Sequence, residues 1–127
     1  MTELSNLDVD TEALCVRASR VDVDGIQLAL TGSAETPAYE ALMTLVRRLQ
    51  ARAHAQRPSE VVVDLRELEF MNSTCIKTFV TWLSELRDAD AVARYPVRFV
   101  FDPSKPWQRR TVGALKSFAP SVVIVAD

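Results

Sequence analysis

Residues 61–83 read VVVDLRELEFMNSTCIKTFVTWL, and they are the most informative part of the chain. Its first five residues are a short apolar run of β-formers, which is typical of a strand covered on both faces. Its second half carries apolar side chains at helical spacing, continued just beyond the stretch: Ile76, Phe79, Val80, Leu83 and Leu86. A short connection over residues 66–72 joins the two halves. The stretch therefore predicts a buried strand that turns directly into an amphipathic helix.

Small hydroxyl residues stand where this helix begins, and Ser73 or Thr74 is the expected N-cap. Backbone N–H groups at a helix start lack intrahelical partners, and the helix dipole is positive there. A phosphate on Ser73 could be held by those donors, and it would add nearly two negative charges beside Phe70, Met71 and Cys75. That charge would be enough to abolish an apolar protein contact. From the pattern alone, a plain capping role is the commoner interpretation.

The regions on either side continue the alternation of strands and helices. Strands are expected at 13–18 and 26–31, joined as a hairpin by the Asp24-Gly25 turn, and further strands at 97–101 and 122–125. Helices are expected from Thr36-Pro37 to Pro58 and over residues 107–118. The order is β-β-α-β-α-β-α-β. This order predicts an α/β domain with a mixed sheet of about five strands and helices packed on it.

The first residues differ from the rest of the chain. Residues 1–10 hold Glu3, Asp8 and Asp10 and no Lys or Arg, so they lack the basic start of a secretory signal. Residues 1–12 are expected to form a flexible acidic arm. A single domain is expected over residues 13–127. The cytoplasm is the expected compartment.

Composition and missing motifs exclude several classes of function. The net charge of −2, with 48% hydrophobic and 25% charged residues, favours a soluble globular protein with neither nucleic acid nor membrane as its main partner. Cys15 and Cys75 show no metal-ligand spacing, and His54 is the single histidine. The three glycines are too far apart for a phosphate loop, and no nucleophile elbow or metalloprotease motif occurs. We therefore expect no enzyme, no cofactor and no metal.

The central stretch resembles the STAS domains, the family named for sulfate transporters and anti-sigma factor antagonists. Family members carry V-x-D-L-x-x-L-x-F at the end of a strand, then M/I-D-S-S/T-G and a helix. The counterparts here are Val62, Val63, Asp64, Leu65, Leu68 and Phe70, followed by Met71-Asn72-Ser73-Thr74-Cys75. A weaker match is Gly32-Ser-Ala-Glu35, where the family often shows G-E-L-D. The resemblance covers residues 13–125, and it implies the same sheet-plus-helices fold.

The resemblance also implies a function in partner switching. In anti-sigma factor antagonists, the first hydroxyl after the Asp is phosphorylated by a GHKL-type serine kinase that is also the anti-sigma factor, and a cognate phosphatase reverses this. Carried over, the acceptor is Ser73, with Thr74 secondary, in a monomer or hetero-complex. The implied partner-binding residues are Phe70, Met71, Asn72, Thr74 and Cys75.

Two departures from the motif keep other functions open. Asn72 replaces the usual Asp, so a negative charge beside the acceptor is missing, and Cys75 replaces the usual Gly. One alternative is a scaffold or sensor domain that binds a protein or small molecule without phosphorylation. Another is an enzyme that uses Cys75, because a helix N-terminus lowers a thiol pKa. The simpler interpretation of Cys75 is a small apolar residue at the junction of sheet and helix.

Overall fold

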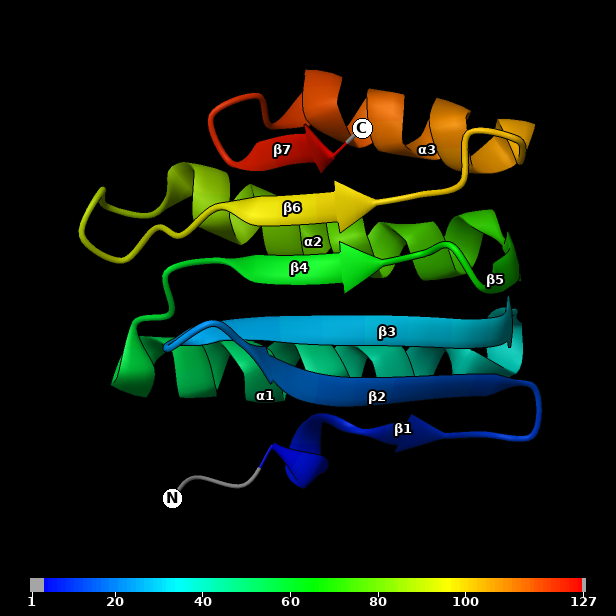
Figure 1. Cartoon of the computed structure of the whole chain (residues 1–127), viewed down its shortest axis with the longest axis horizontal. Helices are drawn as coiled ribbons and strands as arrows, with labels where there is room; N and C mark the ends of the chain where they lie inside the picture. Colours follow the sequence, from blue (N-terminus) through cyan, green and yellow to red (C-terminus); the bar gives the residue numbers. More distant parts are fainter. Residues whose placement is uncertain (1–3, 127) are drawn as a thin grey trace.

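The computed structural model describes residues 4–126, and in it a seven-stranded mixed sheet carries α-helices along one face (Figure 1). The strands are β1 (Val9–Asp10), β2 (Leu14–Val21), β3 (Gly25–Ala34), β4 (Val61–Asp64), β5 (Leu68–Met71), β6 (Val97–Val100) and β7 (Val123–Ala126). The α-helices are α1 (Tyr39–Gln56), α2 (Ser73–Asp88) and α3 (Pro106–Phe118). Short 3-10 turns are η1 (Ser5–Leu7) and η2 (Thr36–Ala38).

The sheet has the order β1-β2-β3-β4-β6-β7. β1, β2 and β3 pair antiparallel, whereas β3, β4, β6 and β7 pair parallel because a helix separates each of them from the next. The α/β class and the element order are confirmed, and the five predicted strands correspond to β2, β3, β4, β6 and β7. β1 and β5 were not predicted, because neither is an apolar run long enough to be recognised as a strand.

The long strand β3 has two parallel partners in succession. β4 pairs with its first half, from Ile26 to Ala29, and β5 pairs with its end, from Gly32 to Ala34. The register shifts after Gly32, whose φ of +96° favours glycine and where a Cβ would lie 2.0 Å from the Ala13 carbonyl oxygen. Gly32 therefore lets β3 change register. As a result, β5 pairs with the end of β3 immediately before α2 begins.

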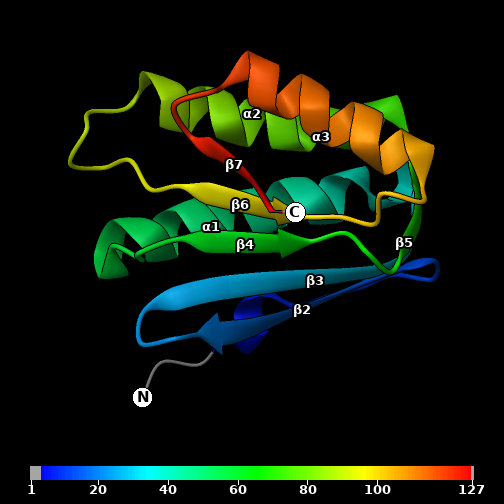
Figure 2. The same ribbon diagram turned by 45° about the horizontal axis from the view of Figure 1, so that its top comes forward.

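The core lies between the sheet and the helices α1 and α2, which cover the same face in both views (Figures 1 and 2). Side chains alternate along β3, so Ile26, Leu28 and Leu30 point inward and are buried. Phe79 of α2 packs edge-on against Phe99 of β6, with ring centroids 5.7 Å apart. These contacts hold α2, and hence its first turn, in a fixed place on the sheet.

The expected flexible arm differs from the structure over residues 4–12, while residues 1–3 lie outside the described residues. Leu7 of η1 is fully buried, and β1 pairs Val9 with Val16 of β2. Asn6 receives hydrogen bonds from Arg48 and Arg52 of α1, at 3.1 and 2.9 Å. The prediction of a flexible arm was based on the acidic residues, but the apolar residues between them are buried and hold the segment against the domain.

Candidate functional site

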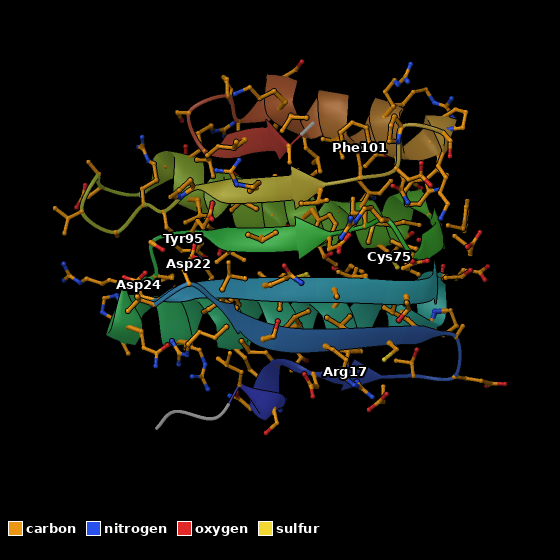
Figure 3. The ribbon with its side chains drawn as sticks, in the orientation of Figure 1. Arg17, Asp22, Asp24, Cys75, Tyr95 and Phe101 are labelled. Carbon is orange, nitrogen blue, oxygen red and sulfur yellow. The ribbon has the colours of Figure 1, made fainter. Side chains whose placement is uncertain are left out.

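The predicted site lies where β4 and β5 lead into α2, at the carboxyl ends of the parallel strands. Figure 3 places Cys75 of the first α2 turn at this end of the sheet and Tyr95 at the opposite end. The β4–β5–α2 segment thus brings Phe70, Asn72, Ser73 and Thr74 together at one edge of the molecule. We call this edge the Ser73 end, and the opposite edge the Tyr95 end.

Asn72, and not Ser73 or Thr74 as predicted, is the N-cap of α2. Its Oδ1 accepts a hydrogen bond from the Cys75 N–H at 2.9 Å, and its Nδ2 donates to Thr36 Oγ1 at 3.1 Å. Its own N–H donates to the Ala34 carbonyl at 2.9 Å. Asn72 therefore ties the end of β3 and η2 to the start of α2, and its amide is a structural group.

Ser73 occupies the first helical position and is exposed. The capping side chain takes the Cys75 N–H, and the Ile76 N–H donates to the Asn72 carbonyl. Within residues 4–126, no protein acceptor is assigned to the N–H groups of Ser73 and Thr74. Two backbone donors at the positive end of the helix dipole therefore remain available beside an exposed hydroxyl, which is the setting that holds a phosphate.

The predicted contact residues divide into exposed and buried side chains. Phe70 is 47% exposed and is a large apolar side chain on the surface of the Ser73 end. Met71 and Cys75 are only 3% and 0% exposed, so the prediction that both contact a partner is corrected. The four residues of β5 do not alternate strictly: Glu69 and Phe70 are exposed, whereas Leu68 and Met71 are buried. The available surface comprises Phe70, Ser73 and the partly exposed Asn72 and Thr74.

The surroundings of Cys75 are those of an inert core thiol. Burial raises the pKa of Cys75, and the nearby Glu35 carboxylate raises it further. The Sγ–H group donates to the Glu35 carbonyl at 3.1 Å. The thiolate needed for nucleophilic chemistry is therefore disfavoured, in spite of the helix N-terminus.

Charged groups fix the turn between β4 and β5. The Arg66 guanidinium donates to both carboxylate oxygens of Asp64, at 3.0 and 2.9 Å, and holds the pKa of Asp64 below its ordinary value. Lys105 Nζ donates to the Arg66 carbonyl at 2.7 Å and lies 3.6 Å from Glu69. Asp64, part of the recognised motif, therefore shapes the turn rather than facing the acceptor hydroxyl.

A buried polar residue that the sequence analysis missed holds the same turn. Gln108 of α3 is fully buried, and its Nε2 donates to the carbonyls of Leu65 and Leu68. Its Oε1 accepts from the Asp102 N–H at 2.8 Å. A glutamine near the start of a basic helix resembles a solvent-facing residue, so no local signal in the sequence could have identified this contact.

At the Tyr95 end, buried side chains form a chain of hydrogen bonds. Trp82 is 1% exposed, and its indole N–H donates to the Tyr95 hydroxyl at 2.8 Å. Tyr95 in turn donates to Gln50 Oε1 at 2.6 Å, and burial raises the pKa of Tyr95 far above its ordinary value. A cavity of about 300 Å³ opens here between α1, the end of α2 and the loop that leads to β6, with His54, Arg57 and Tyr95 among its lining residues.

Two features are missing from the described part of the chain. None of the helices within residues 4–126 combines the length and the apolar character that a membrane crossing requires. Among the same residues, no three His, Cys, Asp or Glu side chains are grouped so that they could hold a metal ion.

Comparison with known proteins finds no matching family model and no matching curated protein, whereas solved structures do match. An anti-sigma factor antagonist from Mycobacterium paratuberculosis is 17% identical, with a TM-score of 0.61 over 84% of this chain and 83% of that one. The unphosphorylated form of the anti-sigma factor antagonist SpoIIAA is 17% identical, with a TM-score of 0.57 over 88% of both chains. The phosphorylated form of Bacillus SpoIIAA is 18% identical, with a TM-score of 0.57 over 88% of this chain and 91% of that one.

These matches span most of both chains and have TM-scores above 0.5, so they concern the whole domain and not one motif. A further matching structure, from Rhodobacter sphaeroides, is described as an antagonist with a STAS domain. The chain therefore has the STAS fold of the anti-sigma factor antagonists, as the motif in residues 61–75 predicts.

Proposed function

We propose that this chain is a non-enzymatic regulatory domain that binds a protein kinase under the control of reversible phosphorylation at Ser73. In its unphosphorylated form it binds a GHKL-type serine kinase that also acts as an anti-sigma factor. Phosphorylation of Ser73 by that kinase ends the complex, and a cognate phosphatase restores it. The cytoplasm is the compartment in which these partners meet.

The observation that carries this proposal is the combination of an exposed hydroxyl and open backbone donors at one helix start. Ser73 is accessible to a kinase, and the N–H groups of Ser73 and Thr74 can donate hydrogen bonds to the phosphate that the kinase adds. Phe70, three residues before Ser73 in the chain, supplies an exposed apolar contact. A phosphate beside that contact opposes binding because a buried, unpaired charge is costly.

A second function is supported by the Tyr95 end. Its cavity of about 300 Å³ could hold a small molecule in a sensor domain that is never phosphorylated. The departure at Asn72 is compatible with this, since its side chain is engaged by Cys75 and Thr36. A third function, thiol chemistry at Cys75, is opposed by its complete burial and raised pKa.

The test begins with the protein purified from its native cell. We expect its intact mass to include a species heavier by one phosphate that phosphatase treatment removes, and peptide mapping to place that phosphate on Ser73. Thr74→Val is the matched control, because it removes the neighbouring hydroxyl and leaves Ser73 in place. Modification at Thr74 alone, or none in the presence of an active partner kinase, would contradict the assignment.

Binding supplies an independent test of the switch. In complexes with the partner kinase, Ser73→Asp should weaken binding at least tenfold, which corresponds to about 1.4 kcal/mol, while Ser73→Ala should preserve it. Calorimetry that gave equal affinity for both variants would place the switch elsewhere.

A further inference from the structure

An apolar groove runs between α2 and α3, on the helical side of the molecule. It has a volume of about 390 Å³. Its lining residues include Ile76 and Val80 from α2, and Arg110, Ala114, Leu115 and Phe118 from α3. Ile76, Val80 and Phe118 are only partly buried, so the groove presents apolar surface to solvent. We call it the α2–α3 groove.

The α2–α3 groove begins at Ile76, about one turn of α2 after Ser73. Residues 73, 76 and 80 are three and seven positions apart along α2, so their side chains lie along one face of the helix. At about 1.5 Å of rise per residue, Val80 lies roughly 10 Å along the axis from Ser73. An occupant that continues about one helical turn beyond Ile76 therefore reaches the Ser73 hydroxyl.

Most of the charges around the groove are basic, and the exception is Asp88 at its far end, which pairs with Arg87 at 3.3 Å. Helix α3 has three basic residues and no acidic one, and the first twelve residues of α2 have Lys77 as their one charge, in a chain whose net charge is −2. Lys77 and Arg110 form no ion pair within residues 4–126. At the far end, Arg87 lies over the Phe118 ring, with Cζ 4.5 Å from the ring centroid. The groove thus combines an apolar floor with a basic rim.

We infer that the α2–α3 groove binds an amphipathic helix of the partner protein, apolar on one side and acidic along its flanks. The apolar side packs on Ile76, Val80 and Phe118, and the acidic flanks meet Lys77 and Arg110. This inference deepens the proposed function, because it rests on Ser73 as the switch and adds how the switch acts. A phosphate at Ser73 places about two negative charges at one end of a basic strip and repels an acidic helix.

The test uses a defined probe rather than an unknown partner. The probe is a labelled 18-residue helical peptide with Leu and Phe at i, i+3, i+4 and i+7 positions and Glu along both flanks. We expect micromolar binding by fluorescence anisotropy, weakened by added salt, with NMR shift changes confined to α2 and α3. A peptide with Lys in place of Glu should bind at least tenfold more weakly. Equal binding of both peptides, or shift changes elsewhere, would overturn the inference.

Variants separate the groove from the rest of the surface. Val80→Glu and Arg110→Glu should each weaken peptide binding at least tenfold. Arg47→Glu on α1 makes the same charge change as Arg110→Glu at an exposed position away from the groove and should leave binding unchanged. Circular dichroism melts of all variants identify any loss that comes from misfolding. If Val80→Glu instead abolishes a concentration-dependent dimer of the free protein, the occupant is a second copy of the chain and the inference fails.

Ser73 variants separate this inference from the proposed function. Ser73→Ala should bind the peptide as the natural protein does, and Ser73→Asp should bind it several-fold more weakly. If no kinase modifies Ser73 but the groove binds the acidic peptide, the proposed switch fails and the docking surface stands. If Ser73 is phosphorylated but the peptide does not bind, the docking surface fails and the switch stands.

Discussion

The two ends of α2 are completed in opposite ways. At its N-terminus, Asn72 takes one backbone N–H and those of Ser73 and Thr74 stay open at the surface. At its C-terminus, the Arg94 guanidinium donates to the carbonyls of Leu86, Arg87 and Ala89 at 3.0–3.2 Å. The closed end is satisfied from within the protein, whereas the open end has donors to offer to another molecule.

Other side chains at the two ends differ as well. The Tyr95 end contains the hydrogen-bonded chain of Trp82, Tyr95 and Gln50, and the Ser73 end exposes Phe70. The helix is therefore anchored at its C-terminus and available for binding at its N-terminus. Substitutions at the closed end should therefore lower stability, and those at the open end should change binding while leaving stability nearly intact.

Tyr95→Phe should have the largest effect on stability. It leaves the buried Trp82 indole N–H and the Gln50 carbonyl oxygen without a partner, so the free energy of unfolding should fall by about 2–3 kcal/mol. Urea denaturation measures it. Tyr39→Phe is the matched control, because no hydrogen bond of the Tyr39 hydroxyl occurs within residues 4–126 and its loss should cost little. Equal effects of both variants would mean that the buried chain contributes nothing.

Arg94→Met should come next. The variant keeps the apolar stem but removes three hydrogen bonds to the carbonyls that end α2, so stability should fall by about 1–2 kcal/mol. Hydrogen exchange should accelerate in the last turn of α2 and not in its first. Arg47→Met, at an exposed position of α1, should stay within about 0.5 kcal/mol of the natural protein.

Asn72→Ala should lower the free energy of unfolding by about 1 kcal/mol, the usual effect of losing an N-cap. It also removes the hydrogen bond to Thr36. This residue at the N-terminus of α2 therefore contributes to stability, although its side chain is partly exposed. Thermal melts measure the loss. A variant as stable as the natural protein would show that solvent caps this helix equally well.

Asn72→Asp should change stability by less than about 0.5 kcal/mol, because Asp caps a helix as well as Asn does and the Thr36 hydroxyl can donate to the carboxylate. The rate of phosphorylation at Ser73 should nevertheless change markedly, since a negative charge now stands beside the acceptor. An increase would mean that the kinase gains from the carboxylate, and a decrease that it is matched to a neutral residue. A rate that stays the same would remove Asn72 from the mechanism.

Ser73→Ala should have the smallest effect on stability, with no measurable shift of the thermal midpoint. The hydroxyl is exposed, and no hydrogen bond from it is assigned within residues 4–126. The same variant should abolish phosphorylation by the partner kinase. A loss of stability comparable to that of Asn72→Ala would mean that Ser73 is part of the cap. The backbone donors at the N-terminus of α2 would then not be open to another molecule.

The sequence predicts the elements whose apolar side chains follow a regular local spacing. The apolar run at residues 61–65 and the helical stripe after Ser73 were sufficient to predict β4, α2 and the α/β order. The cap was assigned to Ser73 or Thr74 because three adjacent residues are all good caps, and the pairing of β3 with β5 decides among them. Met71 and Cys75 were placed at the surface because a motif in the chain does not record which way each side chain points.

The contacts made by Gln108 have a consequence for recognition. The turn that presents Phe70 and Ser73 is fastened to a residue more than thirty positions away, on α3. An excised peptide spanning residues 66–76 lacks that fastening, the β3 pairing partner and the body of α2. The proposed phosphoacceptor would therefore be a conformational epitope: we expect a kinase to modify Ser73 in the folded domain, and not in the excised peptide or in a chain whose α3 has yet to dock.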